Sequence, residues 1–341
     1  MIFVTGGTGL TGAHLLYQLT QNGTRVVALK RPSSNITLVE KIFRYYTRKP
    51  APLMSRIHWV NGSLEDYAAL VKHMEGAGWV YHCAGLVSFD QADKNALFST
   101  NVLGTTHIVN AALENKARKL CFTSSVATLA NPLRQEPADE EALAAADDFE
   151  FRPYYAKTKF LAELEVWRGI EEGLNALIVN PSVILGPGIW HQGSGRFFTS
   201  VYRGLSYYTG GGTGFVDVRD VAALMIQLME SDNNNQRFVL NGANLSYKEL
   251  FEKIANQLQV KPPRKQASPA MTAIAWRMEA LRRLITGKPP ALTRSTARSA
   301  HQTSSYSAQK IHTYVNNPFT PIDETIAHAA RCFLQDQQTA S

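Results

Sequence analysis

The sequence predicts an α/β protein built on a Rossmann-type, doubly wound parallel sheet. In the first 180 of 341 residues, short β-branched runs alternate with longer amphipathic segments, which is typical of βαβ units. A glycine-rich turn joins the first run to the first amphipathic segment. After Pro181 the alternation weakens, and glycine clusters separate aromatic and polar stretches. We therefore expect a smaller, mainly helical substrate-binding region beside the sheet.

The elements of the predicted sheet follow one another in a regular order. Strands are expected where short runs of Val, Ile, Leu and aromatic residues occur, at residues 1–4, 25–29, 57–60, 79–83, 120–123 and 176–179. Helices are expected where apolar residues recur at spacings of three and four, at residues 10–21, 38–48, 65–74, 94–113 and 154–172. Strand and helix patterns return at residues 215–229 and 237–240.

Composition and charge exclude several classes of protein. Apolar residues form 45% of the chain and charged residues 18%, as in globular domains and unlike disordered or coiled-coil chains. Cys83, Cys121 and Cys332 are too few and too scattered for a disulfide framework or a metal centre. The net charge of +7 arises after residue 260, where eleven Lys and Arg residues face four Asp and Glu residues. Because the preceding residues are neutral overall, we expect no nucleic-acid partner.

The chain carries no pattern typical of export or membrane insertion. It opens on an apolar strand pattern at residues 1–4, without a cationic leader. No apolar run approaches the roughly 18 residues that a membrane-spanning helix requires. We therefore expect a cytoplasmic protein with no integral membrane association.

The turn after the first strand has the spacing of a phosphate-binding loop. Residues 5–12 read TGGTGLTG, so Gly6, Gly9 and Gly12 stand three apart. Glycine permits a tight turn, close approach of the backbone to a pyrophosphate and close packing of the helix on the strand. The helix N-terminus then supplies free N–H groups. A turn without a ligand is the alternative, but the strand-turn-helix context favours dinucleotide binding.

A tyrosine and a lysine four residues apart lie on one face of a helix. This spacing occurs at Tyr45/Lys49, Tyr155/Lys159 and Tyr306/Lys310. In doubly wound sheets, ligands bind at the carboxyl ends of the strands. The Tyr155 pair alone follows a strand end that carries hydroxyl groups, at Ser124 and Ser125. Position therefore selects Tyr155 and Lys159.

These residue types are suited to moving a proton to or from a substrate oxygen. A tyrosine has a pKa near 10, and a lysine cation beside it favours the phenolate. A serine hydroxyl stabilises negative charge that develops on the substrate oxygen. Ser125, Tyr155 and Lys159 are thus the expected catalytic residues. The alternative is a half-exposed helix face beside a serine that caps the strand.

Together these motifs resemble the extended short-chain dehydrogenase/reductase superfamily, which includes NAD(P)-dependent epimerases and dehydratases. The resemblance covers nearly the whole chain, and residues 5–12 resemble the nucleotide loop. Ser125, Tyr155 and Lys159 resemble the catalytic set. Asn101 resembles the asparagine of the active-site helix, and residues 215–221 resemble a late strand-to-helix signature. The resemblance implies an NAD(P)-dependent enzyme and a homodimer formed through helices 94–113 and 154–172.

The resemblance also implies further residues of the cofactor site and a division of the chain into two regions. Residues 82–85 resemble the strand end beneath the nicotinamide ribose, so His82 and Cys83 are interpreted as structural. Residues 62–66 resemble the segment that meets adenine, with Ser63 in place of an aspartate. The NAD(P)-binding domain is expected at residues 1–180 and 215–243, and the substrate-binding region at 181–214 and 244–341. The expected cofactor-binding residues are Gly6, Thr8, Gly9, Leu10, Gly12, Lys30, Arg31, Ser63, Leu64, Ala84, Gly85, Asn101, Tyr155, Lys159, Pro181 and Ser182.

The end of the second strand predicts a preference for NADP(H) over NAD(H). NAD enzymes of this architecture usually place an acidic residue there, which binds the ribose hydroxyls. This chain has Lys30-Arg31 instead. Two cations without a carboxylate favour the 2′-phosphate of NADP, although both side chains are also compatible with simple exposure to solvent.

The segment before Gly186-Pro187 indicates a branch of the superfamily. Nucleotide-sugar enzymes typically have a diphosphate-binding asparagine where this chain has Val183. The pattern resembles the dihydroflavonol-reductase and 3β-hydroxysteroid-dehydrogenase branch, which implies a carbonyl or secondary alcohol on a small, largely apolar substrate. A nucleotide-sugar epimerase or dehydratase remains an alternative, because the chain offers cations for a diphosphate at Arg196, Arg203 and Arg219.

The sequence leaves two other classes of function as alternatives. A nucleotide-sensing regulator without turnover is disfavoured because both Tyr155 and Lys159 are present. An accessory protein that binds a membrane surface or RNA through the basic tail would show salt-sensitive binding without nicotinamide.

The basic tail contains one strongly amphipathic pattern. Met271, Ile274, Ala275, Met278, Leu281 and Ile285 recur at threes and fours, with arginines elsewhere on the turn. The first interpretation is a helix that packs its apolar face on the substrate region. A second is a mobile cover over an apolar substrate, formed by Met271, Trp276 and Met278. A third is a helix that lies on a membrane surface.

Overall fold

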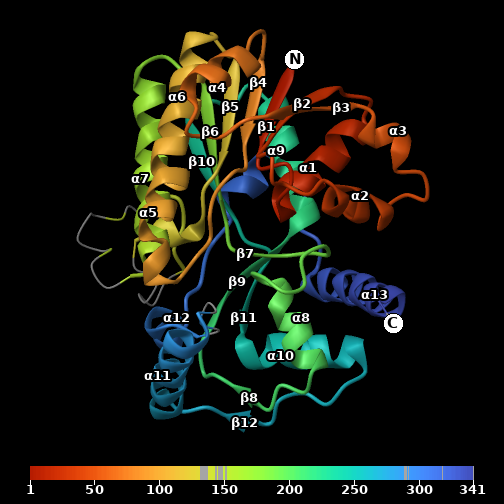
Figure 1. The fold of residues 1–341 in the computed structure, drawn as a ribbon, viewed down its shortest axis with the longest axis vertical. Helices are drawn as coiled ribbons and strands as arrows, with labels where there is room; N and C mark the ends of the chain where they lie inside the picture. Colours follow the sequence, from red (N-terminus) through yellow and green to blue (C-terminus); the bar gives the residue numbers. More distant parts are fainter. Residues whose placement is uncertain are drawn as a thin grey trace.

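The computed structural model describes residues 1–130, 137–142, 144, 149, 152–287, 290, 292–316 and 318–340. A seven-stranded parallel sheet forms its centre, in the order β10-β6-β5-β4-β1-β2-β3 (Figure 1). The order reverses between β1 and β4, and ligands of such sheets bind at the carboxyl ends beside the reversal. The predicted Rossmann-type fold is confirmed. The strands are β1 (Ile2–Thr5), β2 (Val26–Lys30), β3 (Ile57–Asn61), β4 (Trp79–His82), β5 (Lys119–Thr123), β6 (Ala176–Pro181) and β10 (Gln236–Leu240).

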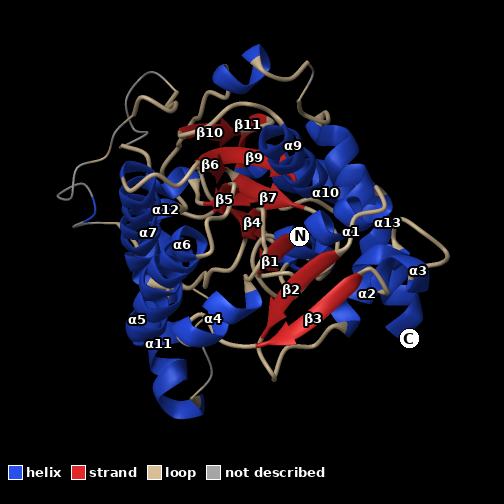
Figure 2. Ribbon diagram, turned by 90° about the horizontal axis from the view of Figure 1, so that it is seen from above, coloured by secondary structure: helices blue, strands red, loops and turns tan. Residues whose placement is uncertain are grey.

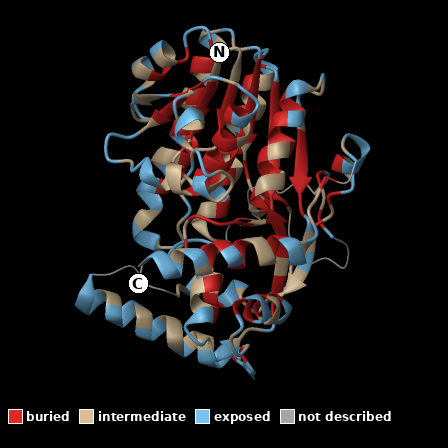
Figure 3. Ribbon diagram, turned by 90° about the vertical axis from the view of Figure 1, so that its right-hand side faces the viewer, coloured by how far each residue is buried: buried red, intermediate tan, exposed pale blue. Residues whose placement is uncertain are grey.

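Helices cover both faces of this sheet (Figure 2). One face packs on α1 (Leu10–Gln21), α2 (Thr37–Arg44) and α9 (Val218–Glu230). The other packs on α4 (Tyr67–His73), α6 (Gly104–Glu114) and α7 (Tyr154–Glu171). Strand side chains alternate between the two cores, as Phe3 and Val4 do in β1. Because both faces are covered, most strands of this sheet are buried along nearly their whole length (Figure 3).

Two of the expected helices differ from their sequence pattern. The expected helix 94–113 is divided into α5 (Lys94–Leu97), a π-helical segment η2 (Phe98–Leu103) and α6. The expected helix 38–48 ends at Arg44, and a short α3 (Ala51–Met54) follows Pro50. The residue before a proline avoids the helical region, which separates the two helices. Short 3-10 turns lie at η1 (Gln91–Asp93) and η3 (Val126–Thr128).

The region below the large sheet combines helices with two small sheets that the sequence analysis did not anticipate. Strand β9 (Gly212–Asp217) pairs parallel with β7 (Val183–Leu185) and antiparallel with β11 (Ala243–Ser246). Strand β12 (Lys265–Gln266) pairs with β8 (Tyr207–Tyr208). Residues of α8 (Gly195–Tyr202), α10 (Tyr247–Leu258) and α13 (Ile322–Ala340) share a core with β7 and β9. A capping box of Ser246 and Glu249 starts α10.

Helix α11 (Pro269–Thr286) lies at the margin of the molecule and packs on α12 (Arg294–Ser299), as Figure 1 shows. The expectation that its apolar face packs on the substrate region is wrong, since no residue of α11 is buried. The chain then returns to the large sheet, where Tyr306 and Ile311, the latter in η5 (Lys310–Thr313), join the core. In the described part of the chain, no helix is long and apolar enough to cross a membrane.

Candidate active site

The glycine loop makes contacts that no larger residue would permit. Gly6 has φ +72°, and a Cβ there would lie 2.5 Å from the Ala84 nitrogen. A Cβ on Gly12 would lie 2.2 Å from the Gly6 oxygen. The Gly9 N–H donates to Gly6 at 2.9 Å, and α1 begins at Leu10 without a side-chain cap. This bare turn at a helix N-terminus fits a pyrophosphate.

A chain of hydrogen bonds joins this loop to the helix that carries Asn101. The Ala84 N–H donates to Thr5 Oγ1 at 3.3 Å, and Thr5 Oγ1 bonds His82 Nδ1 at 2.7 Å. On the far side of the ring, His82 Nε2 lies 3.0 Å from Thr105 Oγ1, which donates to the Asn101 carbonyl at 2.6 Å. This pattern assigns the proton to Nε2. Burial lowers the pKa of His82 to about 3, so the ring is neutral and structural.

Asn101 lies in the π-helical segment η2 and fixes the loop after β4. Its Oδ1 accepts from the Leu86 N–H at 2.7 Å, and its Nδ2 donates to the Leu86 carbonyl at 3.0 Å and to Thr158 Oγ1 at 3.1 Å. A Cβ on Gly85 would meet Asn101 Oδ1 at 3.5 Å and Lys159 Nζ at 3.8 Å. Single π-helical turns are often found at functional sites. Here the segment brings Asn101, Gly85 and Lys159 together.

Lys159 is buried beneath the carboxyl end of β5. Its Nζ donates to the Thr123 carbonyl at 2.7 Å and lies 4.2 Å from the centroid of the Phe122 ring. Burial lowers the pKa of Lys159 to about 7, while the carboxylate of Glu163 favours the cation. Lys159 is therefore poised between its two protonation states near neutral pH.

Tyr155 and Ser125 face each other at the same strand end. Burial raises the pKa of Tyr155 above its ordinary value, and a hydrogen bond with the Ser125 side chain opposes this shift. Ser125 Oγ also accepts from the Ala127 N–H at 3.2 Å, which fixes the turn after β5. The Phe89 ring packs edge-on against Tyr155 with centroids 6.0 Å apart. At neutral pH the phenol thus carries its proton and can donate it.

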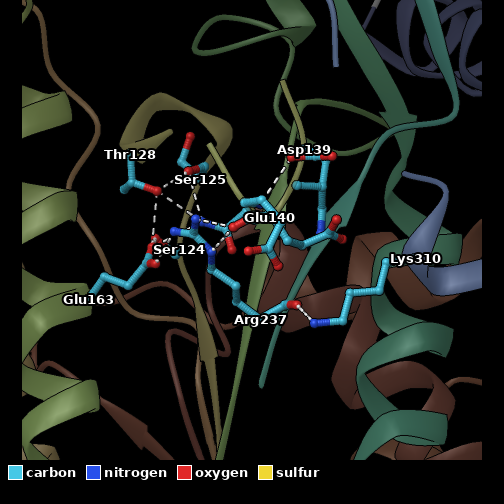
Figure 4. A network of polar contacts seen from close by, with 11 residues as sticks. Ser124, Ser125, Thr128, Asp139, Glu140, Glu163, Arg237 and Lys310 are labelled. Atoms are coloured by element: carbon cyan, nitrogen blue, oxygen red, sulfur yellow. Dashed lines mark hydrogen bonds and ion pairs between the residues drawn. The ribbon is translucent and has the colours of Figure 1, made fainter. Parts of the chain in front are cut away.

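Behind these residues lies a buried carboxylate that the sequence analysis missed. Glu163 is 3% exposed, and one oxygen accepts from Ser124 at 2.8 Å, Thr128 at 3.0 Å and Asn180 at 3.0 Å. Its other oxygen pairs with Arg237 at 3.2 Å (Figure 4). Glu163 stands four residues after Lys159, so extending the Tyr155/Lys159 spacing by one step would have found it.

The residues expected around the adenine and ribose lie along the far half of the sheet edge. Lys30 ends β2 and donates to Asn61 Oδ1 at 2.8 Å, while Arg31 is exposed. A Cβ on Gly104 would meet Leu64 at 2.9 Å. Ser63 Oγ accepts from the Glu65 N–H at 3.2 Å.

The remaining expected residues are placed as follows. Thr8 is half-buried in the glycine loop. Pro181 ends β6 and is buried. Ser182 donates through its N–H at 3.0 Å and its hydroxyl at 3.3 Å to the Leu240 carbonyl, so its side chain is engaged inside the fold.

The other two tyrosine-lysine pairs lie elsewhere in the fold. Tyr45 donates to Asp336 at 2.5 Å, on α13. Tyr306 is buried in the core of the large sheet, and Lys310 donates to the Arg237 carbonyl at 3.0 Å.

The arginines considered for a diphosphate and the residues considered as metal ligands also have structural partners or lie at the surface. Arg219 pairs with Asp217 at 2.6 Å, whereas Arg196 and Arg203 are exposed. Within the described ranges, no three His, Cys, Asp or Glu side chains are grouped to hold a metal. Thr123 Oγ1 lies 3.6 Å from the Cys83 sulfur, and burial raises the pKa of this thiol to about 11.

Comparison with known proteins identifies the family. Residues 2–241 match the model of the NAD dependent epimerase/dehydratase family. The chain belongs to this family. A putative dihydroflavonol 4-reductase from Synechocystis sp. is 28% identical over 339 residues, covering 97% of this chain and 94% of the relative. Sterol demethylase protein B from Methylococcus capsulatus is 27% identical over 73% of this chain and 72% of its own.

Solved structures agree with this assignment. The crystal structure of gox2253 superimposes with a TM-score of 0.81 at 27% identity, over 98% of both chains. The UDP-glucose 4-epimerase of Thermotoga maritima gives a TM-score of 0.75 over 98% of this chain and 99% of its own. At 17% identity it shows the fold alone.

The family member described here is an enzyme of the extended short-chain dehydrogenase/reductase type that uses a pyridine nucleotide. The residues at the sheet edge fit such a cofactor, since the cradle at Gly6 and Gly12 would be filled by any Cβ. Named reductases among the relatives make it an oxidoreductase of the NAD(P)-binding class.

Proposed function

We propose that this enzyme interconverts a carbonyl and a secondary alcohol on a small, largely apolar substrate, using Ser125, Tyr155 and Lys159 and preferring NADP(H). The observation that carries the proposal is the meeting of these three side chains at the carboxyl end of β5. Tyr155 contacts Ser125. Lys159 lies one turn after Tyr155 in α7 and donates to the carbonyl of Thr123 at the end of β5. When bound, the nicotinamide supplies or accepts the hydride.

Each of the three residues has a distinct task in the proposed reaction. In the reducing direction, the Tyr155 hydroxyl donates its proton to the substrate oxygen, and in the oxidising direction the phenolate accepts it. The Ser125 hydroxyl donates a hydrogen bond to the same oxygen as negative charge develops there. The Lys159 cation stabilises the phenolate that remains. Because Lys159 is buried, its charge acts with little screening by water.

The surroundings of Tyr155 favour an apolar substrate over a nucleotide sugar. Phe89, 41% exposed, and Val87, 60% exposed, lie on the loop that packs against Tyr155. Val183 lies in β7 and packs on the core of the lower region, so it offers no polar group to a diphosphate. The epimerase or dehydratase alternative is supported by the family match and by the shared fold.

The Tyr155→Phe variant tests this function. It keeps the ring contact with Phe89 and removes the proton donor, so cofactor binding is expected to persist while turnover falls roughly 10²- to 10⁴-fold. The control is Tyr154→Phe on the same helix. Turnover is followed by nicotinamide absorbance with apolar aldehydes, ketones and secondary alcohols, beside nucleotide sugars. Full turnover in Tyr155→Phe, or turnover of nucleotide sugars alone, would refute the proposal.

We also infer a homodimer through the helices on one side of the sheet. Phe98 and Leu103 in η2 and Leu164 in α7 are 37%, 43% and 46% exposed. An apolar face of this kind is typical of subunit contacts. Analytical ultracentrifugation of the wild type and of Leu164→Glu tests it: the wild type is expected to sediment as a dimer and the variant as a monomer.

A further inference from the structure

Helix α11 turns its polar side toward the protein and its apolar side toward solvent, which is the reverse of the usual arrangement for a surface helix. Its side toward the protein is largely polar: Thr272 bonds His301 at 2.9 Å, and Arg283 forms an ion pair with Asp90. Surface helices normally bury their apolar side. Here the apolar side chains face solvent, at Met271, Ile274, Met278, Leu281 and Ile285, which we call the apolar stripe.

The apolar stripe is continuous along the helix. Its members are spaced by three and four residues, which places them along one side. Ile274, Met278, Leu281 and Ile285 are 61%, 66%, 59% and 78% exposed. The residues toward the protein, Thr272, Trp276, Glu279 and Arg283, show the same spacing and fall on the opposite side. A mobile cover built from Met271 and Met278 is not supported, because both point away from the protein.

The charge around α11 indicates what the stripe contacts. Residues 261–305 contain nine Lys and Arg residues and a single acidic residue, Glu279. Arg277 and Arg282 are exposed and border the stripe on its two sides. A second copy of this chain would bring these cations against one another, which is unfavourable. A surface that offers phosphate groups above an apolar layer would attract these cations and also bury the apolar stripe.

We propose that α11 docks this enzyme on the surface of an anionic phospholipid bilayer. The apolar stripe enters the boundary between headgroups and acyl chains, and Arg277 and Arg282 lie at the level of the lipid phosphates. The helix lies along the surface and does not span it. This role goes beyond the proposed reaction and stands without it.

Docking through α11 also orients the candidate active site. Arg283 pairs with Asp90, and the neighbouring Phe89 packs against Tyr155. Tyr155 is thus one loop away from the docked helix. An apolar substrate dissolved in the bilayer would have a short path to Tyr155.

Vesicle flotation of the 341-residue chain tests the proposal. Phosphatidylcholine vesicles with and without phosphatidylglycerol are the probes, at low and high salt. The variant Met278→Glu/Leu281→Glu places two charges on the stripe, and Ala280→Glu/Thr286→Glu makes the same charge change on other sides of α11. The wild type is expected to float with anionic vesicles at low salt, and the stripe variant to bind at least about ten-fold more weakly. The control variant is expected to lose only the electrostatic part and therefore to bind these vesicles more tightly than the stripe variant does.

Three results would overturn the proposal. They are failure of the wild type to float with anionic vesicles, equal weakening in both variants, and binding unchanged in the stripe variant. Ultracentrifugation distinguishes the rival occupant: if the stripe variant alone abolishes self-association and nothing floats, the stripe is a contact between copies. Circular dichroism and thermal unfolding show that each variant is folded, since neither pair of positions is buried.

Discussion

A buried carboxylate and a buried lysine four residues apart set the electrostatics of the candidate site. Burial lowers the pKa of Lys159 to about 7, and the negative charge of Glu163 opposes that shift. Glu163 itself faces Arg237 from β10, hydroxyls from Ser124 and Thr128, and the amide of Asn180. The groups acting on Lys159 besides Glu163 are the Cys83 thiol and the neutral His82.

We predict that Glu163→Gln shifts the pH dependence of reduction. Removing the carboxylate charge disfavours the Lys159 cation, so its pKa falls. Activity that needs this cation is present below the pKa and lost as pH rises through it, so the alkaline limb of kcat/KM moves to lower pH. The control is Glu165→Gln, which removes a half-exposed acid paired with Arg168. An unchanged alkaline limb in a folded Glu163→Gln protein would show that Glu163 is structural only.

A second prediction concerns Lys30 and Arg31. If they bind the 2′-phosphate, the Lys30→Ala/Arg31→Ala variant loses two charge-assisted contacts and binds NADP(H) more weakly by roughly 10- to 100-fold. Its affinity for NAD(H) is expected to change little. Titration of both cofactors by fluorescence measures this. Tighter binding of NAD(H) by the wild type would contradict the prediction.

At the scale of elements, α7 shows what a sequence can and cannot reveal. Its pattern predicted Tyr155 and Lys159 on one face, because helical spacing is local. Glu163 lies on that face too, but its partners Asn180 and Arg237 come from β6 and β10. Nothing near Glu163 in the sequence indicates them, and so the polar network in Figure 4 was not predicted.

The π-helical segment η2 was likewise not predicted, because the spacing of apolar residues over 94–113 is that of one continuous helix. Its key contact is the pair of hydrogen bonds between the Asn101 side-chain amide and the Leu86 backbone. We predict that Asn101→Ala leaves both backbone groups without this partner and lowers the free energy of unfolding by roughly 2 kcal/mol. Thr100→Ala, in the same segment, is the control. Urea unfolding of the two variants decides it, and equal effects would assign no special role to Asn101.

At the scale of the whole molecule, the sequence predicted correctly the strands of the large sheet that alternate with helices along the chain. From β1 to β5, each strand of the large sheet is followed by a helix before the next strand begins, so alternating patterns define this part of the sheet. The small sheets join β7 to β9 and β8 to β12 across long separations, in strands of two to six residues. Such short strands carry too few residues for a periodic signal. The orientation of α11 also depends on its neighbours, which the amphipathic pattern alone does not contain.

Buried histidines predict how the stability of the whole fold depends on pH. Burial lowers the pKa of His14 to about 4 and that of His82 to about 3, against 6.5 in an unfolded chain. Between pH 6.5 and these values the unfolded chain binds protons that the folded chain does not. Unfolding is therefore favoured as pH falls through this window, and each histidine contributes roughly 3 kcal/mol of loss by pH 4.

Urea unfolding of the wild type between pH 7 and pH 4.5 should show this loss. In His82→Asn, one of the buried titrating groups is absent, so stability at pH 7 is lower but its decline with pH is shallower by about one proton. His58→Gln, which alters an exposed histidine, is expected to keep the wild-type slope. Because Thr5 and Thr105 join His82 to the glycine loop and to η2, a slope unchanged in His82→Asn would mean that this buried ring does not couple protonation to folding.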